Sequence, residues 1–285
     1  MPAKLSKPNN YYIRGRDLVL NEYTQPNNIG ELPMFLHQTW KSELMKQDYM
    51  NSFDNWSKLH PGFLHVLWTD EDNDLLVSTW FPQYLASYKW LPIIIQKTDF
   101  VRLMYLYRYG GIYADMDYVA YQALPPLLPQ LCGFMAVQSP FSLNENLQNS
   151  LMISSPGHPL VFEALEIINQ TVIDLKSRQK YPLLNLNNKF TGPLLSTFLT
   201  LSLTGPQVLD KAVSRMATSS KYSNENIVGL DESFFKGPVA AHLQHITWMK
   251  TLPKKCMPLI MVVVVSFLLL IAMIVLITHY SSRKK

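Results

Sequence analysis

Two aspartates, Asp115 and Asp117, are the pair of side chains in this sequence best suited to chemistry. Residues two positions apart on a β-strand point to the same face, so a strand would place both carboxylates side by side. Carboxylate oxygens bind divalent cations, and two such groups repel each other when no cation lies between them. The pattern therefore predicts a cation site, although a solvated acidic turn would carry the same residues.

The residues before this pair favour a binding site over a simple turn. Gly110 and Gly111 allow a sharp turn from a helix into the short apolar strand 112–114. The two carboxylates would then follow a buried strand at its carboxyl end, which is where open α/β sheets bind their ligands.

Asp99 and Arg102 form a second candidate pair on the helix predicted for residues 96–109. They are three residues apart and therefore share one helix face. One interpretation is a surface ion pair, which would contribute only about 0.2–0.5 kcal/mol. The other is that Arg102 binds a phosphate through its fork of donors while Asp99 accepts hydrogen bonds from sugar hydroxyls. The spacing is compatible with both.

Aromatic and histidine side chains add weaker candidates at two places. His37 ends the first predicted strand, Trp40 lies three residues beyond it, and Trp68 ends the second. These tryptophans could stack on a planar base, but such residues fill cores more often, and a lone histidine after an apolar strand is usually packed. His242 and Trp248 supply further donors near the end of the folded region.

Alternating strand and helix patterns must position these residues. The apolar patterns predict strands over residues 32–37, 63–68, 112–114, 132–138 and 150–154. They predict helices over residues 70–81, 96–109, 159–175, 192–203 and 206–216, the first of them capped by Thr69 or Asp70. Such alternation predicts an α/β fold with parallel strands in its sheet.

Composition narrows the class of protein. Apolar residues make up 48% of the 285 residues and charged residues 16%, which excludes an intrinsically disordered chain. Five terminal cations account for the formal net charge of +4, and without them 20 basic residues face 21 acidic ones. A near-neutral body argues against nucleic-acid binding. The two cysteines, Cys132 and Cys256, cannot form a thiol metal cluster or a disulfide framework.

The carboxyl-terminal part contains a long apolar run. Residues 257–280 hold no Asp, Glu, Lys or Arg. As a helix, their apolar centre would cover about 30 Å, the hydrocarbon thickness of a bilayer. We therefore expect a polar amino-terminal arm (1–30) without a signal-peptide pattern, a folded domain (31–252), a transmembrane helix (257–280) and a basic tail (281–285). The flanking cations do not orient the helix.

Taken in order, these blocks resemble glycosyltransferase family 32, the DXD sugar-binding family. The family opening I-P-x-x-x-H-Q-x-W is matched by residues 32–40, with Leu32 in the first place, and W-T-D is matched by residues 68–70. The central K-x-D-x-x-R…Y-G-G-I-Y-x-D-x-D block is matched by residues 97–117. A T-G-P follows at residues 191–193, and H-x5-W follows at residues 242–248. That ending and the apolar run are similar to inositol phosphoceramide mannosyltransferases.

The resemblance implies a GT-A (Rossmann-like) glycosyltransferase domain, a nucleotide-sugar donor, Mn²⁺ or Mg²⁺, and retention of anomeric configuration. It implies metal ligation by Asp115, Asp117 and His242, and catalytic roles for Asp115, Asp117 and Arg102. It further implies that the donor contacts His37, Gln38, Trp40, Asp99, Arg102, Tyr113, Asp115, His242 and Trp248. Whether the acceptor attacks the front face or a covalent intermediate forms stays open.

The resemblance also implies a reaction and its partners. The expected reaction moves mannose from GDP-mannose to a sphingolipid such as inositol phosphoceramide, with a regulatory membrane subunit as a further partner. The alternative is transfer of galactose or N-acetylglucosamine to glycolipid or protein glycans. Two rivals are a D-x-D phosphatase, matched only by Asp115–Val119, and a non-catalytic membrane protein, which would not need all four charged site residues.

The membrane and the side that the domain faces are separate questions. We expect a single-pass protein of the Golgi or endoplasmic reticulum membrane, held by its carboxyl-terminal helix. The apolar run ends five residues before the last residue, which favours a cytosolic domain, whereas the family resemblance implies the Golgi lumen. Two glycosylation sequons, at Asn55 and Asn169, do not decide between them.

Overall fold

The computed structural model of the chain describes residues 5–8, 11–21, 32–127, 133–139, 146–177, 192–222 and 226–243. The chain divides into two units, of which the first comprises Met1–Tyr181 and Phe198–His245. Of the second unit, Pro182–Thr197 and Ile246–Lys285, only residues 192–197 are described. The sheet and the candidate site described below belong to the first unit.

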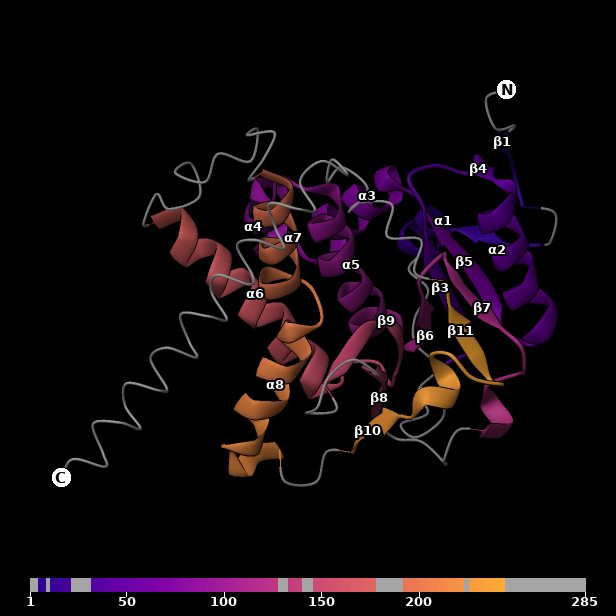
Figure 1. Ribbon diagram of the computed structural model, residues 1–285. Helices are drawn as coiled ribbons and strands as arrows, with labels where there is room; N and C mark the ends of the chain where they lie inside the picture. The colour runs from indigo at the N-terminus through magenta and orange to yellow at the C-terminus, as the bar shows by residue number, and fades with distance from the viewer. Residues whose placement is uncertain are drawn as a thin grey trace, which may run out of the picture. The chain divides into compact units, whose positions relative to one another are not determined.

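A seven-stranded mixed sheet forms the centre of the first unit (Figure 1). Its strands, in spatial order, are β10 (Ile227–Leu230), β8 (Phe134–Gln138), β9 (Leu147–Ser154), β6 (Gly111–Ala114), β3 (Phe35–Thr39), β5 (Leu64–Trp68) and β2 (Ile13–Arg14). The neighbours β6, β3, β5 and β2 run parallel, and β9 runs antiparallel to both β6 and β8. The predicted α/β sheet with parallel strands is confirmed, and the antiparallel β9 makes it mixed.

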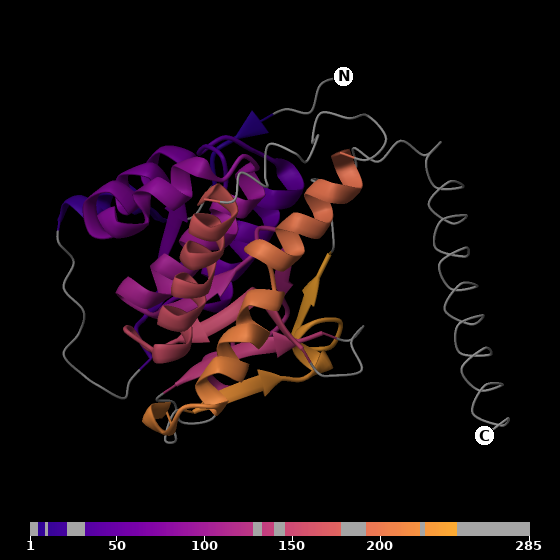
Figure 2. The ribbon, with the colours of Figure 1, turned by 90° about the vertical axis from the view of Figure 1, so that its left-hand side faces the viewer.

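Helices cover the sheet. They are α1 (Gly15–Leu20), α2 (Gln47–Leu59), α3 (Asp70–Trp80), α4 (Leu85–Trp90), α5 (Ile94–Tyr109), α6 (Pro159–Ser177), α7 (Gly192–Leu203) and α8 (Gln207–Ala217). Short 3₁₀ turns are η1 (Pro82–Tyr84), η2 (Pro125–Leu127), η3 (Ser220–Tyr222) and η4 (Glu232–Phe234). Seen from one side, α6 and α8 lie in front of the strands (Figure 2).

Local sequence signals explain where the helices around the site begin and end. Thr69 caps α3 by accepting a hydrogen bond from the Asp72 amide, and the Asp72 carboxylate accepts one from the Thr69 amide, as expected for a capping box. Helix α5 ends at Gly110 and Gly111, whose φ angles are 65° and 91°. A Cβ on Gly111 would collide with the Phe35 carbonyl oxygen, so only glycine allows β6 to lie against β3 here.

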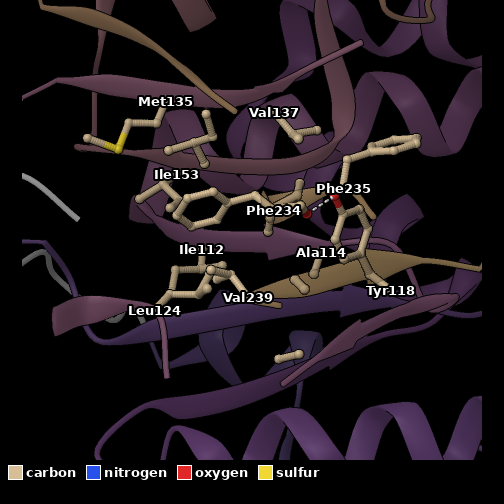
Figure 3. Packing of buried hydrophobic residues seen from close by; sticks show 14 of the residues in the cluster. Ile112, Ala114, Tyr118, Leu124, Met135, Val137, Ile153, Phe234, Phe235 and Val239 are labelled. Atoms are coloured by element: carbon tan, nitrogen blue, oxygen red, sulfur yellow. Dashed lines mark hydrogen bonds between the residues drawn. The ribbon is translucent and has the colours of Figure 1, made fainter. Parts of the chain in front are cut away.

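The sheet face opposite α5 packs into a hydrophobic cluster (Figure 3). Ile112 of β6, Met135 of β8 and Ile153 of β9 pack there against Phe234 and Val239. Burying apolar surface stabilises a fold by about 25 cal/mol per Å². This cluster therefore provides a rigid base beneath the loop that follows β6.

Two small sheets complete the fold. Strand β7 (Tyr118–Ala120) pairs antiparallel with β11 (Ala240–His242), with Tyr118 opposite His242. Strand β1 (Leu5–Ser6) pairs with β4 (Met45–Lys46). The β7–β11 pairing brings residues 120 or more positions apart in sequence to the same place beside the end of β6.

Three expectations differ from the structure or lie beyond it. Within the predicted loose arm, residues 13–20 form β2 and α1, because Arg14 pairs with buried Asp72 and Leu18 enters the core. Strand β3 begins at Phe35, after Pro33, rather than at residue 32. Of the helices in the described ranges, none has the length and apolarity needed to cross a bilayer. The predicted segment 257–280 and the tail 281–285 lie outside those ranges.

Candidate active site

The predicted metal ligands converge at the carboxyl end of β6. Asp115 follows the strand directly, and its amide donates to the Ser150 carbonyl oxygen at 2.8 Å. His242, at the end of β11, places Nε2 3.2 Å from Asp117 Oδ1 and 3.9 Å from Asp115 Oδ2. Candidate ligand atoms of the three half-buried side chains lie within 4.8 Å of one another. That spacing fits a single divalent cation.

The protonation equilibria of these groups also fit a cation site. Burial raises the pKa of Asp115, and the neighbouring Asp117 charge adds to the rise, while Arg102 opposes it. Burial lowers the pKa of His242, but a hydrogen bond to Asp117 and the charge of Asp115 outweigh burial, so the net shift is upward. Asp115 and His242 therefore hold protons more readily than usual, and a divalent cation would compete with protons at these two groups.

Arg102 is a buried bridge between two carboxylates. Its Nη2 lies 3.1 Å from Asp99 Oδ1, and its Nη1 lies 3.1 Å from Asp115 Oδ1. Nη1 also donates to the Asn149 carbonyl oxygen at 2.8 Å, and the guanidinium lies 4.8 Å from the centre of the Tyr113 ring. Arg102 is 2% exposed, so it is not part of a surface ion pair. It fixes the orientation of Asp115.

Tyr113 contacts Asp115, and Asp99 contacts Arg102. The Tyr113 hydroxyl donates to Asp115 Oδ1 at 2.7 Å. Asp99 accepts from Asn149 Nδ2 and from the Thr204 hydroxyl, both at 3.1 Å. Burial raises the pKa of Asp99 to about 7, although the positive charge of Arg102 acts in the opposite direction. Both residues thus hold Asp115 and Arg102.

His37 lies inside the protein core rather than on the nucleotide side where the resemblance implied it. It is fully buried, and its Nδ1 accepts from Trp68 Nε1 at 3.1 Å. Its Nε2 lies 3.0 Å from the Gly110 carbonyl oxygen and therefore donates to it. Burial lowers the pKa of His37 to about 4, so the ring is neutral. His37 is buried because β3 is covered on both faces and its side chain points toward α5.

Gln38 contacts the backbone of Asp115. Its Nε2 donates to the Asp115 carbonyl oxygen at 3.3 Å, and its Oε1 accepts from His65 Nε2 at 3.0 Å. The other ring nitrogen of His65 contacts the Ser57 hydroxyl. His65 and Asn149 were not predicted as supporting residues. His65 is a polar residue within an otherwise apolar strand, which could have identified it, whereas Asn149 lies between Gln148 and Ser150 and does not stand out.

The two tryptophans differ in exposure. Trp68 is fully buried and stacks on Tyr105 with ring centres 4.3 Å apart, so it fills the core. Trp40, beyond the end of β3, is half-buried and packs 4.3 Å from Tyr49. Its buried Nε1 has no hydrogen-bond partner among the described residues. Trp40 thus keeps an unused donor, and the predicted site residue Trp248 lies outside the described ranges.

Known proteins match the chain in both sequence and fold. Residues 46–133 match the family described as "Glycosyltransferase sugar-binding region containing DXD motif". Inositol phosphoceramide mannosyltransferase 3 of Schizosaccharomyces pombe is 32% identical over 52% of this chain and 40% of its own length. Inositol phosphoceramide mannosyltransferase 1 of the same organism is 27% identical over 70% of this chain and 59% of its own length. The chain thus spans about half the length of these relatives.

The fold comparison agrees with the sequence comparison. The ligand-free glycosyltransferase domain of the YGT toxin superposes with a TM-score of 0.51 over 74% of this chain and 82% of that chain, at 10% identity. This similarity concerns the fold alone and supports the expected GT-A class. The chain therefore has a mixed α/β glycosyltransferase fold, and its sequence is similar to the sugar-binding region of the DXD-motif glycosyltransferases, as its motifs predict, and to inositol phosphoceramide mannosyltransferases.

Proposed function

We propose that the chain is a retaining, metal-dependent glycosyltransferase that moves mannose from GDP-mannose to inositol phosphoceramide or a closely related membrane lipid. The observation that supports this most is the convergence of Asp115, Asp117 and His242 at the carboxyl end of β6. The names of the two relatives suggest the sugar and the acceptor.

In this proposal the three converging residues hold Mn²⁺ or Mg²⁺. When bound, the cation neutralises the negative charge that builds on the departing diphosphate. Arg102 and Tyr113 both bond Asp115 Oδ1, so Oδ2 is left facing His242. Fixing a ligand carboxylate in this way lowers the cost of reorganisation when a cation and a donor bind.

Contacts at Asp99 support attack on the front face of the donor. Oδ1 of Asp99 contacts Arg102 and Asn149, and Oδ2 accepts from Thr204. The side chain is 4% exposed, so it is poorly placed to attack a sugar as a nucleophile. Attack by the acceptor hydroxyl from the side of the departing diphosphate needs no such residue. Retention of configuration would then arise without a covalent intermediate.

The acceptor has one alternative with its own support. The initiation-specific alpha-1,6-mannosyltransferase of Schizosaccharomyces pombe is 23% identical over 74% of this chain and 55% of its own length. That name gives mannose transfer without a lipid acceptor, and we keep a protein-linked glycan as the second candidate. Lipid extracts of cells lacking the protein should lose a mannosylated inositol phosphoceramide, whereas normal lipids with altered protein glycans would favour the second candidate.

We further propose that residues 257–280 anchor the chain in the Golgi or endoplasmic reticulum membrane, with the catalytic domain in the cytosol and a regulatory membrane subunit as partner. The two sequons bear on this orientation. The side-chain oxygen of Asn55 accepts from the Ala120 amide, and that of Asn169 accepts from Ser87. Both asparagines are thus engaged in the fold. Protease protection in sealed microsomes tests the orientation, and a protected, glycan-bearing domain would reverse it.

The donor is tested by hydrolysis with the purified full-length chain in detergent. GDP-mannose, UDP-galactose and UDP-N-acetylglucosamine are compared with Mn²⁺ and with a chelator. The proposal expects Mn²⁺-dependent release of GDP from GDP-mannose above both other donors. Equal rates with chelator would contradict metal dependence, and preference for a UDP-sugar would contradict the mannosyl donor.

A further inference from the structure

The buried carboxylate of Asp99 is held by a residue from a distant part of the chain. Thr204 follows directly after α7, 105 residues beyond Asp99, and its hydroxyl lies 3.1 Å from Asp99 Oδ2. Thr204 is 1% exposed and Asp99 is 4% exposed, so solvent has little access to either partner of this bond. The described contacts of Oδ1 go instead to Arg102 and Asn149.

A chain of contacts runs from this hydroxyl to the metal ligands. With Oδ2 held by Thr204, the carboxylate plane of Asp99 presents Oδ1 to Arg102 Nη2. The same guanidinium then presents Nη1 to Asp115 Oδ1, which leaves Asp115 Oδ2 toward His242. Each contact is buried or half-buried, and hydrogen bonds to charged groups are strong in such surroundings.

We propose that Thr204 is a positioning residue for the candidate metal site, acting through Asp99 and Arg102 on the orientation of Asp115. This inference rests on the proposed function for the identification of the cluster as a metal site, whereas the contacts themselves do not depend on it. Outer contacts of this kind orient metal ligands, and their loss typically lowers metal affinity or activity about 10- to 100-fold. Thr204 is the first residue of a second T-G-P string, residues 204–206, whereas the family block was assigned to residues 191–193.

A purely local role for Thr204 is the competing explanation. Its hydroxyl also lies 3.3 Å from the Thr200 carbonyl oxygen, one helical turn earlier, so it could simply finish α7. Thr200 itself supplies a matched comparison. It is 2% exposed on the same helix, and its hydroxyl has no hydrogen-bond partner among the described residues. An isosteric change at each position therefore separates burial of a threonine from contact with Asp99.

The test compares Thr204→Val, Thr204→Ser and Thr200→Val with the wild-type full-length chain. Affinity for Mn²⁺ alone is measured by calorimetry, donor hydrolysis is measured as kcat and KM, and folding is measured by thermal unfolding. Thr204→Val should bind Mn²⁺ about 10- to 100-fold more weakly and lose kcat, because Asp115 is less well oriented. Thr204→Ser should keep the wild-type Mn²⁺ affinity and kcat, and Thr200→Val should match wild type in both. If Thr204→Val does not fold, Thr204→Ala, which leaves space for a water beside Asp99, replaces it.

The outcomes separate the positioning role of Thr204 from the proposed function. Wild-type Mn²⁺ affinity and kcat in Thr204→Val, or in Thr204→Ala where that replaces it, would overturn the positioning role. So would a serine variant as impaired as the valine variant, since that would assign the effect to shape. If the wild-type chain binds Mn²⁺ but hydrolyses none of the donors, the proposed function fails, while the Mn²⁺ affinities still decide the role of Thr204.

Discussion

Asp99→Asn is expected to make the fold more stable. Asp99 is buried, and burial raises its pKa from 3.8 to about 7 even with Arg102 beside it. Asparagine keeps the shape without the charge. Its carbonyl oxygen can accept from Arg102 and Asn149, and its amide can donate to Thr204, whose hydroxyl is then free to donate to the Thr200 carbonyl oxygen.

The size and the pH dependence of the gain follow from linkage. The folded chain holds a proton on Asp99 between pH 3.8 and pH 7, where the unfolded chain has lost it, so ionisation of Asp99 weakens the fold progressively as pH rises through this window. One pKa unit corresponds to about 1.4 kcal/mol, so the cost is about 2 kcal/mol at pH 5 and reaches about 4 kcal/mol above pH 7. The asparagine variant avoids this cost.

Denaturant unfolding at pH 5 and at pH 8 measures the effect. The stability gain of Asp99→Asn over wild type should be about 2 kcal/mol larger at pH 8 than at pH 5. Asp72→Asn is the matched control. Asp72 is also buried, but hydrogen bonds from Arg14 and Arg16 outweigh burial and lower its pKa, so its replacement should weaken the fold at pH 8. A gain for Asp99→Asn that is equal at both pH values, or absent at pH 8, would refute the reasoning.

Two further predictions concern other parts of the site. Arg102→Lys should lower turnover about 10- to 100-fold, because one ammonium group cannot hold Asp99 and Asp115 together and a charged hydrogen bond contributes about 1.5–3 kcal/mol; wild-type kinetics would contradict the bridging role. The pKa of His37 falls by burial to about 4, below its unfolded value of 6.5, so His37 weakens the fold as pH drops through that window. His37→Gln should therefore lose about 3 kcal/mol less stability than wild type between pH 7 and pH 4.5, measured by denaturant unfolding; an unchanged loss would contradict the neutral buried ring.

Features set by neighbouring residues could be predicted from the sequence. The spacing of Asp115 and Asp117, the cap at Thr69 and the end of α5 at Gly110 are local, and the structure contains all three. The spacing of Asp99 and Arg102 likewise predicted a shared face. Their contacts with Asn149 could not be predicted, because Asn149 reaches them only when β9 pairs with β6.

Features set by distant contacts needed more than spacing. His242 meets Asp117 only because β11 pairs with β7, and the family resemblance, rather than local pattern, pointed to it. For His37 the resemblance implied a donor contact, but the residue is buried in the core. A residue at the end of an apolar strand can face the ligand or the core, and the helix packed on that face decides which. Thr204 begins a second T-G-P string, but its partner Asp99 lies 105 residues away, so the string alone could not predict their contact.

The central claim is that Asp115, Asp117 and His242 hold a divalent cation that sugar transfer requires. The most direct measurement is Mn²⁺-dependent mannose transfer from GDP-mannose to inositol phosphoceramide by Asp117→Ala, with Asp48→Ala on the exposed start of α2 as control. Removing one of two close carboxylates also removes their repulsion, so the variant should stay folded. We predict loss of Mn²⁺ binding and of transfer in Asp117→Ala alone, at unchanged thermal stability. Wild-type transfer by folded Asp117→Ala in the presence of Mn²⁺ would contradict the claim.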